Sequence, residues 1–546
     1  MKKNNFVEGT VIATAVIVIV KLLGLLYVIP FYQIVGDQGG DLYSYAYNIY
    51  MIFLSISSAG LPDAIAKIIS EYNALEMEDA KKRAYMIGKK IISIISITSF
   101  LILFVFAEEI GMFIIGNLKG GNTAEDVAFV IRCLSPAVLL IPFLSITKGF
   151  LQGHKYISAS SMSQLIEQIV RIFVILAGSF LTYKVFRGTL SLAVGIAVSG
   201  AFFGGLAAYL YLKRVINKNN LLKESRTKDN ISNREITKKI IIYAIPFVII
   251  SVINSLYNET DQILVLRLLE YLKFDAKEVE NIAAAIATWS PKICIIINAM
   301  AMGMTMSLVP TIVSSFAKKD HKDVERQINK TLSMIVFVSL PLSIGISVLS
   351  NSIWTLFYTP SEIGGNILRL MAFSALLGNL VMIVSTLCQS VNKYHAVYIV
   401  AILGLVLNAG LDIPIMILYN KIGLPTYLGS ITATMIGYSI SILIGLLILR
   451  KENKYSYTNA FKNILKSLIP GLSMLFVLVL VNHFLPFDAF SKKTAVFNII
   501  IDVIIGAPIY IGLSLKLGLV DEILGRTMFN KLIRKITFGK INLKDA

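Results

Sequence analysis

The stretch "VIVIVKLLGLLYVIP", Val16 to Pro30, decides the fold class of this chain. It belongs to a run from Val11 to Pro30 in which every residue except Lys21 is apolar, small or aromatic. About 20 such residues are what an α-helix needs to cross a hydrocarbon core. The run therefore predicts a membrane-spanning helix with Lys21 near its middle. A charge there costs roughly 2.5–3.5 kcal/mol by insertion scales, so we expect Lys21 to have a partner or a function.

The composition extends this interpretation to the whole chain. Of the 546 residues, 56% are hydrophobic and 15% are charged, and the mean hydropathy is +0.73. Soluble domains carry nearer ~25% charged residues. The net charge of +18 would favour nucleic-acid binding in a soluble chain. Here the basic residues form short clusters between apolar segments, where they act as topology signals, so we predict no nucleic-acid partner.

About fourteen apolar segments have spanning length, which predicts an all-α membrane protein. Alternating loops place roughly 37 of the 51 Lys and Arg on one side and about 10 on the other, as the positive-inside rule requires. Both termini are therefore predicted to be cytoplasmic. The N-terminal run has no small-residue cleavage site and is long enough to span, so we interpret it as an uncleaved first helix.

Two pairs of segments predict an internal duplication. "AGLPDAIAKIISEYNALEMEDAKKRAYMI" (59–87) resembles "MSLVPTIVSSFAKKDHKDVERQINKTLSMI" (306–335), and "GFLQGHKY" (149–156) resembles "STLCQSVNKY" (385–394). The offset of about 240 residues is typical of two six-helix lobes in parallel, with the substrate site between them. The predicted parts are an N-terminal lobe (1–213), a basic cytoplasmic linker (214–238), a C-terminal lobe (239–450), two further helices (451–520) and a basic amphipathic cytoplasmic tail (521–546).

Motifs for catalysis, metals and cofactors are missing from the sequence. Cys133, Cys294 and Cys388 stand apart, the four histidines are scattered, and there is no P-loop, HExxH or GxSxG. "SITK" (145–148) matches SxxK without its companion motifs. We therefore predict no enzyme, no metal site and no cofactor. The glycines of "GDQGGD" (36–41) are interpreted as an outside turn between the first two spans.

Two lysines inside spans are the strongest site candidates. Neither Lys21 nor Lys292 has an acidic residue three or four positions away, and both lie about ten residues from either surface. Lys292 follows Pro291, which should disturb the local hydrogen-bond ladder. Because the two lysines belong to opposite repeats, we expect them to meet at the lobe interface and bind an anion such as phosphate.

The other intramembrane charges have structural alternatives. Glu167 and Arg171 are one helical turn apart and can neutralise each other, which favours a structural pair. Asp261 is interpreted as lying about five residues from the outer end of its span, and Asp412 occupies the second-repeat place of Arg171. We keep Asp261, Glu167 and Asp412 as candidates for ion coupling. Asp502, interpreted as near a helix end, is expected to be structural.

Three stretches carry a resemblance to a known family: "KLLGLLYVIPFYQIVGDQGGDLYSYAYNIYMIFL", "GLPDAIAKIISEYNA" and "LSPAVLLIPFLSITKGFLQGHKYISASSMSQLIEQIVRIF". The chain resembles the polysaccharide-transporter branch of the multidrug/oligosaccharidyl-lipid/polysaccharide exporter superfamily. Within it, the chain is similar to the group that contains stage V sporulation protein B and the Gram-positive lipid II flippase. The resemblance implies fourteen helices, two six-helix lobes, alternating access, and a groove for a polyprenyl tail at the last two helices.

The resemblance also implies a binding site. Lys21 and Lys292 stand where basic residues of helices 1 and 8 line the cavity in Gram-negative relatives. Tyr27 replaces a second basic residue of helix 1, and the second span, 41–60, has no Lys or Arg, which departs from the family pattern. We expect Lys21, Lys292, Arg171 and Tyr27 to bind the substrate.

The expected function is a flippase for an undecaprenyl-diphosphate-linked saccharide, with lipid II as the first candidate, in the cytoplasmic membrane. Cell-wall synthesis enzymes are expected partners. Alternatives of the same class are an exporter of another polyprenyl-linked oligosaccharide or of a sporulation-specific cortex precursor, and a drug/cation antiporter. A membrane enzyme and a non-transporting scaffold remain as alternatives from other classes.

Overall fold

Helices make up nearly all of the chain that the structure describes, and those residues contain no strand. The computed structural model describes residues 16, 19–58, 60–116, 121–222, 229–485 and 487–523. Within its helices only the backbone is described at Asp63, Ala74, Pro246, Phe247, Asn254, Asn258, 300–311, Ser314 and Ala317. Thirteen helical segments in the described residues are long and apolar enough to cross a membrane. The predicted all-α, multi-pass architecture is confirmed.

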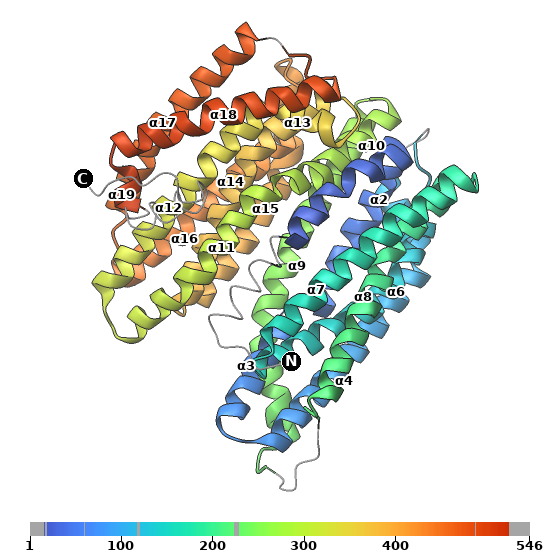
Figure 1. Ribbon diagram of the computed structural model, residues 1–546, viewed down its shortest axis with the longest axis vertical. Coiled ribbons are helices and arrows are strands. Elements are labelled where there is room, and N and C mark those ends of the chain that lie inside the picture. Colours follow the sequence, from blue (N-terminus) through green and yellow to red (C-terminus); the bar gives the residue numbers. More distant parts are fainter. Residues whose placement is uncertain are drawn as a thin grey trace. The chain divides into compact units, whose positions relative to one another are not determined.

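The helices follow one another in two comparable series (Figure 1). The first series contains α2 (Val28–Ser58), α3 (Leu61–Ala74), α4 (Glu78–Val105), α5 (Ala107–Ile115), α6 (Ala124–Gly153), α7 (Ile157–Phe173), the π-helices η1 (Val174–Gly178) and η2 (Leu181–Val185), and α8 (Leu190–Lys218). The second contains α9 (Asn233–Tyr271), α10 (Ala276–Ala284), the π-helix η3 (Ala285–Trp289), α11 (Ser290–Ala317), α12 (His321–Val348), α13 (Ser350–Phe357), α14 (Glu362–Ser390), α15 (Tyr394–Lys421) and α16 (Leu428–Asn453). They are followed by α17 (Thr458–Phe484), α18 (Lys492–Lys516) and α19 (Leu519–Ile523).

The first candidate span, Ile19–Ser58, is 40 residues long and folds back on itself at Gly36. Gly36 has φ 68° and ψ −171°, a backbone conformation that is essentially restricted to glycine. The hydroxyls of Tyr27 and Tyr43 are 3.5 Å apart, although a straight helix would separate the two residues by about 24 Å. The first arm (19–35) and the second arm (37–58) therefore run antiparallel and correspond to the first two predicted spans. Counted separately, they account for the predicted fourteen.

Two turns of the first series recur in the second with the same backbone conformation. Glu76 after α3 and Lys319 after α11 have φ of 56° and 58°. Lys155 after α6 and Asn392 after α14 have φ of 68° and 61°. In all four turns the next N–H bonds to the carbonyl five residues back, at 2.8–3.0 Å, the pattern of a Schellman helix end. Because each pair is separated by about 240 residues, these turns confirm the predicted duplication.

The chain divides into two compact units. The first comprises Met1–Lys292 and Phe357–Thr359, and the second comprises Ile293–Leu356 and Pro360–Ala546. The first unit therefore includes α9, α10 and η3 from the second series. This division follows packing, whereas the lobe boundaries inferred from the sequence follow the duplication, and those boundaries stay a prediction.

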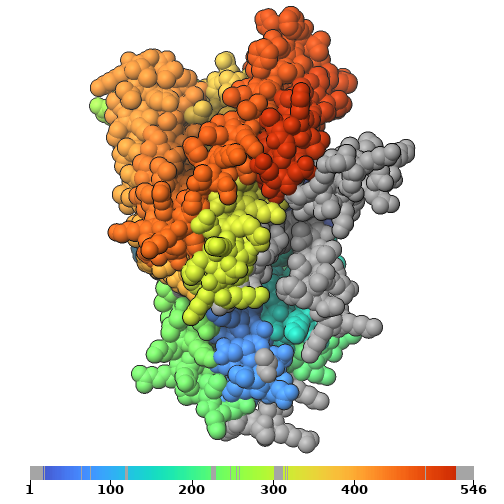
Figure 2. All heavy atoms as spheres, turned by 90° about the vertical axis from the view of Figure 1, so that its left-hand side faces the viewer, coloured from blue at the N-terminus to red at the C-terminus, as the bar shows by residue number. Residues whose placement is uncertain are grey.

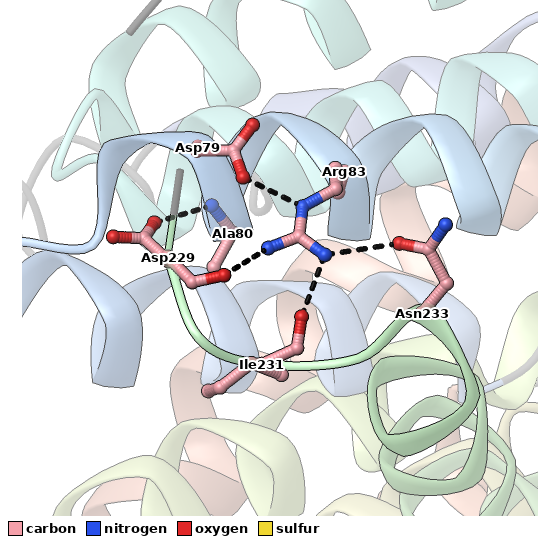
Figure 3. A network of polar contacts seen from close by, with 6 residues as sticks. All are labelled: Asp79, Ala80, Arg83, Asp229, Ile231 and Asn233. Carbon is pink, nitrogen blue, oxygen red and sulfur yellow. Dashed lines mark hydrogen bonds and ion pairs between the residues drawn. The ribbon is translucent and has the colours of Figure 1, made fainter. Parts of the chain in front are cut away.

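In the first unit, Arg83 attaches the end of the inter-repeat linker to α4 (Figure 3). Its guanidinium donates to the Ile231 carbonyl at 2.6 Å and to the Asp229 carbonyl at 3.0 Å, and it pairs with Asp79 at 2.8 Å. The Asp229 carboxylate accepts a 2.8 Å bond from the Ala80 N–H, at the helix end that favours anions. The chain thus enters α9 from a defined position beside α4. Residues 223–228 of the predicted linker lie outside the described residues.

In the second unit, α17 and α18 form part of the surface and are drawn orange to red in Figure 2. They are attached to earlier helices of this unit by few polar contacts, among them a 2.7 Å bond from the Tyr510 hydroxyl to the Phe337 carbonyl. Their outer faces carry exposed apolar side chains such as Leu472, Phe476 and Ile504. Such faces suit contact with lipid chains. Most of the predicted amphipathic tail, 524–546, lies outside the described residues.

Candidate functional site

The ammonium group of Lys292 lies among four aromatic rings of the first unit. Its Nζ is 4.4 Å from the ring centroid of Trp289, 5.0 Å from Tyr43, 5.2 Å from Tyr27 and 5.5 Å from Tyr47. It donates a 2.9 Å hydrogen bond to the Tyr27 hydroxyl. No carboxylate pairs with it within the described residues. Because cation–π contacts contribute roughly 0.5–2 kcal/mol each, this aromatic cage stabilises the charge without neutralising it.

A π-helical turn positions the cage. η3 ends at Trp289, directly before Ser290 and Pro291, where the sequence predicts a disturbed hydrogen-bond ladder. The Trp289 carbonyl accepts a 2.8 Å bond from the Tyr358 hydroxyl, and the two rings lie 5.7 Å apart. Single π-helical turns inside longer helices occur frequently at functional sites. The local irregularity therefore holds Trp289 and Lys292 in a defined orientation.

A buried polar network attaches η3 to α2 and α9. The Asn48 amide donates to Gln262 Oε1 at 2.7 Å and to Thr288 Oγ1 at 3.1 Å. Ser44 lies 2.6 Å from Thr288 and accepts a 3.0 Å bond from Gln262. All four residues are at most 5% exposed. Because every member has a partner, the network orders the three elements around the cage.

Arg171 lines a small cavity together with Tyr43, Tyr47 and Tyr50 of α2. The space open to the centre of a water molecule is about 10 Å³, which is room for about one water. The Nε atom of Arg171 has no hydrogen-bond partner among the described residues. Arg171 and Lys292 are close enough to repel each other electrostatically. Two cations therefore share one wall of tyrosines, an arrangement that favours an anion but holds nothing larger than water in this conformation.

Glu167 pairs with two cations. Its carboxylate lies 3.0 Å from the Arg171 guanidinium and 2.9 Å from Lys148 Nζ. The predicted Glu167–Arg171 pair is thus confirmed, and Lys148 of "SITK" joins it. With both carboxylate oxygens engaged, Glu167 holds α6 and α7 together.

Lys21 is half-buried on the first arm. One turn further on, Gly24 lies against α7, because a Cβ there would be 3.2 Å from Gln168 Nε2. α7 also carries Glu167 and Arg171, so this arm runs beside the helix that bears the ion pair. Both Lys21 and Lys292 belong to the first compact unit, although the duplication assigns them to opposite repeats. Their predicted meeting around an anion stays a prediction.

Two of the predicted ion-coupling residues are buried. Asp261 is 7% exposed, and α9 continues ten residues beyond it to Tyr271. Its position near the outer end of the membrane span stays a prediction. Asp412 is 0% exposed and lies 3.4 Å from the Asn408 amide nitrogen.

Asp502 lies in the middle of α18 and not near its end as expected. It is 1% exposed and accepts a 2.7 Å bond from the Asn482 amide on α17. This contact joins α17 to α18 and agrees with the structural role expected from the sequence.

Sequence reasoning missed most of the cage. It also missed Lys148, the second cation of the ion-pair cluster formed by Glu167, Arg171 and Lys148. Tyr43, Tyr47 and Tyr50 follow one another at helical spacing in "LYSYAYNIY", so one face of the helix bears all three. That spacing was the available signal. Trp289 lies three residues before Lys292, a helical spacing that was also available as a signal. Lys148 meets Glu167 from the neighbouring helix α6, and such a contact leaves no spacing pattern.

Comparison with known proteins identifies the family. Residues 6–316 match the family described as "Polysaccharide biosynthesis protein", and residues 246–413 match "MatE". The chain is 30% identical to "Lipid II flippase MurJ" of Bacillus subtilis (strain 168), over 96% of this chain and 98% of that protein. It is 26% identical to "Stage V sporulation protein B" of the same organism, over 39% of each chain.

Among solved structures, the fold is similar to "Lipid II flippase MurJ, inward closed conformation". The TM-score is 0.67 at 18% identity, covering 93% of this chain and 99% of the other. Taken with the family matches, this fold makes the chain a transporter rather than an enzyme. The chain belongs to the polysaccharide-transporter branch of the multidrug/oligosaccharidyl-lipid/polysaccharide exporter superfamily.

Proposed function

We propose that this chain is a flippase that moves an undecaprenyl-diphosphate-linked saccharide, lipid II, across the cytoplasmic membrane for peptidoglycan synthesis. The similarity to a lipid II flippase along almost the entire chain supports this cargo. The observation that carries the proposal is the cage around Lys292, a half-buried ammonium that no described carboxylate neutralises. A diphosphate is the kind of ligand that such a charge suits.

In the proposed binding site, Lys292 and Arg171 contact the diphosphate. Lys21 supplies a third charge from the first arm, and the Tyr27 hydroxyl orients Lys292. Because the cavity beside Arg171 holds about one water, the site must widen before it accepts a lipid headgroup. Alternating access would provide that widening, with the polyprenyl tail remaining in the bilayer beside the exposed apolar faces of α17 and α18.

Ion coupling is assigned to Asp412 and Asp261 in this proposal, since both are buried carboxyl groups inside spans. Glu167 is a weaker candidate, because two cations already occupy its carboxylate. We place both termini in the cytoplasm on the charge asymmetry of the loops. Enzymes of cell-wall synthesis are the proposed partners, as suppliers and users of the cargo.

A drug/cation antiporter is the second candidate function, because residues 246–413 match the MatE family. That function requires a carboxylate in the cavity to bind a cation. The cavity beside Arg171 is lined instead by tyrosines, apolar residues and the arginine itself. An exporter of a sporulation-specific cortex precursor would use the same diphosphate contacts. The similarity to stage V sporulation protein B makes this function an alternative.

The proposal is tested in proteoliposomes loaded with labelled lipid II, and in cells depleted of their own flippase. Lys292→Ala and Lys21→Ala should abolish flipping and complementation while the protein inserts at normal levels. Lys277→Ala is the matched control, because Lys277 is exposed on α10. Normal complementation by both Lys292→Ala and Lys21→Ala would contradict the proposal. Efflux of cationic drugs by the wild type, without lipid II flipping, would favour the antiporter.

A further inference from the structure

Glu259 of α9 is a buried carboxyl group that the proposed function does not use. It is 4% exposed, and neither of its carboxylate oxygens has a hydrogen-bond partner among the described residues. It lies between two polar contacts of α9 with α2. On one side Ser255 is 2.8 Å from Ser55, and on the other Gln262 accepts a 2.7 Å bond from Asn48. Its position in the packed helix interface explains why its carboxyl group is shielded from solvent.

Glu259 shares a neighbour, Tyr45, with two other buried acids. Tyr45 of α2 interacts electrostatically with Glu259, with Asp41 on its own helix and with Glu280 on α10. The Tyr45 hydroxyl is also buried without a partner among the described residues. Ion pairs in the described residues include none of these three acids. Three ionised carboxylates around one hydroxyl would therefore be uncompensated in a low-dielectric site.

Among the described side chains, no cation of the elements packed against α9 forms an ion pair with Glu259. Arg267 of α9 lies two turns away and bonds to the Phe113 carbonyl, and Lys277 of α10 is exposed. Glu71 of α3 pairs with Lys239, Lys67 of α3 lies over the Tyr243 ring, and Arg83 of α4 bonds to Asn233. These contacts lie at the start of α9, about 24 Å or more along the helix from Glu259. η3 carries no ionisable side chain, and Asp261 on α9 itself is acidic.

Glu280 and Glu259 differ in the number of hydrogen-bond donors that stabilise their ionised forms. Glu280 accepts bonds of 2.7 Å and 2.6 Å from the backbone and amide of Asn122, which favour its anion. Glu259 has no donor of this kind in the described residues. We propose that Glu259 is a proton-binding site, neutral in the conformation seen here, which releases its proton when α2 and α9 separate and water reaches it.

This site differs from the lysine site in ligand and in location. Ionisation of Glu259 requires water to enter between Ser255–Ser55 and Gln262–Asn48, so proton release is coupled to loosening of the α2–α9 contact. Coupling to cargo movement rests on the proposed function, but proton binding itself does not. A proton suits Glu259 as ligand, because protonation removes the charge of a buried carboxyl group that no described donor stabilises.

Infrared spectroscopy of the full chain in lipid tests the proposal without any transport assay. At pH 7 a protonated-carboxyl band should be present, and it should shift when glutamate is labelled with ¹³C. The band should disappear in Glu259→Gln and persist in Glu235→Gln, a matched change at an exposed position of the same helix. Absence of a glutamate-derived band in the wild type, or its persistence in Glu259→Gln, would overturn the assignment.

Two further measurements are planned. One applies if Glu259→Gln does not fold, and the other tests whether proton release is coupled to separation of α2 from α9. If Glu259→Gln does not fold, Glu280→Gln should retain the band, and its loss there would assign the proton to Glu280 instead. Raising the pH of the wild type should remove the band and at the same time increase hydrogen exchange in peptides of α2 and α9 beyond the base-catalysed increase seen in the other helices. Loss of the band with unchanged exchange would refute the coupling to α2–α9 separation. Because neither measurement uses lipid II, failure of the flippase proposal would leave both results valid.

Discussion

Arg171 and Lys292 are neighbouring cations of the first unit that are stabilised in different ways. Arg171 shares a carboxylate with Lys148, whereas Lys292 is held by four rings and one hydroxyl. An ion pair cancels the charge that it stabilises, but an aromatic cage does not. The comparison indicates that Glu167 fixes Arg171 in the packing and leaves one net positive charge on Lys148 and Arg171 together, whereas the cage keeps the whole charge of Lys292 available to a ligand. The following predictions test this difference.

Removal of the shared carboxylate should have the largest effect. Glu167→Gln leaves the half-buried Lys148 and Arg171 without a counter-ion. Breaking a fully buried pair costs about 3–5 kcal/mol, which is the upper limit for this site. We expect a large loss of folded protein in membranes, measured by thermal unfolding in detergent. Glu235→Gln, at an exposed site, should unfold like the wild type. Equal stability of the two variants would mean that the cluster is not structural.

Removal of the caged charge should affect binding and leave stability nearly unchanged. In Lys292→Met no carboxylate is left unpaired, so thermal unfolding should stay close to wild type. Binding of a lipid diphosphate should fall roughly 10- to 100-fold, as expected for loss of a charge-assisted contact. Titration of the purified protein with undecaprenyl diphosphate measures this. A strongly destabilised variant with unchanged affinity would assign the cage to packing.

Loss of the one cage hydroxyl that accepts a bond from Lys292 should have a smaller effect. Tyr27→Phe keeps the ring over Lys292 but removes the hydrogen bond, which typically contributes about 0.5–1.5 kcal/mol. We expect a several-fold fall in the rate of flipping, while Tyr27→Ala, which also removes the ring, should be more impaired. Identical rates for Tyr27→Phe and wild type would show that ring contacts alone orient Lys292.

The linker contact of Arg83 should have the smallest effect. Arg83→Ala removes bonds to the Ile231 and Asp229 carbonyls at a partly exposed site. We expect faster hydrogen exchange in residues 229–235 and normal flipping, because the cage lies in other elements. A transport defect as large as that of Lys292→Met would connect the linker to the site.

Much of the fold was predictable because membrane spans leave a strong local signal. Length and hydropathy were enough for the helical class, and the matched turns at Glu76 and Lys319 repeat a pattern visible in the sequence. The spacing of Glu167 and Arg171 was enough to pair them. The end of α9 was not predictable in this way, because hydropathy marks where apolar residues stop, whereas the helix continues to Tyr271.

The sequence by itself determined that this chain is a duplicated helical membrane protein with lysines inside its spans, since these properties depend on residues close together in the chain. Only the tertiary structure decided what surrounds each charge. Tyr27 reaches Lys292 because the chain reverses at Gly36, and Glu259 is isolated because α2 packs along α9. Contacts between residues hundreds of positions apart depend on which helices become neighbours, and the periodicity of a single sequence shows that a helix face is buried but not against which partner.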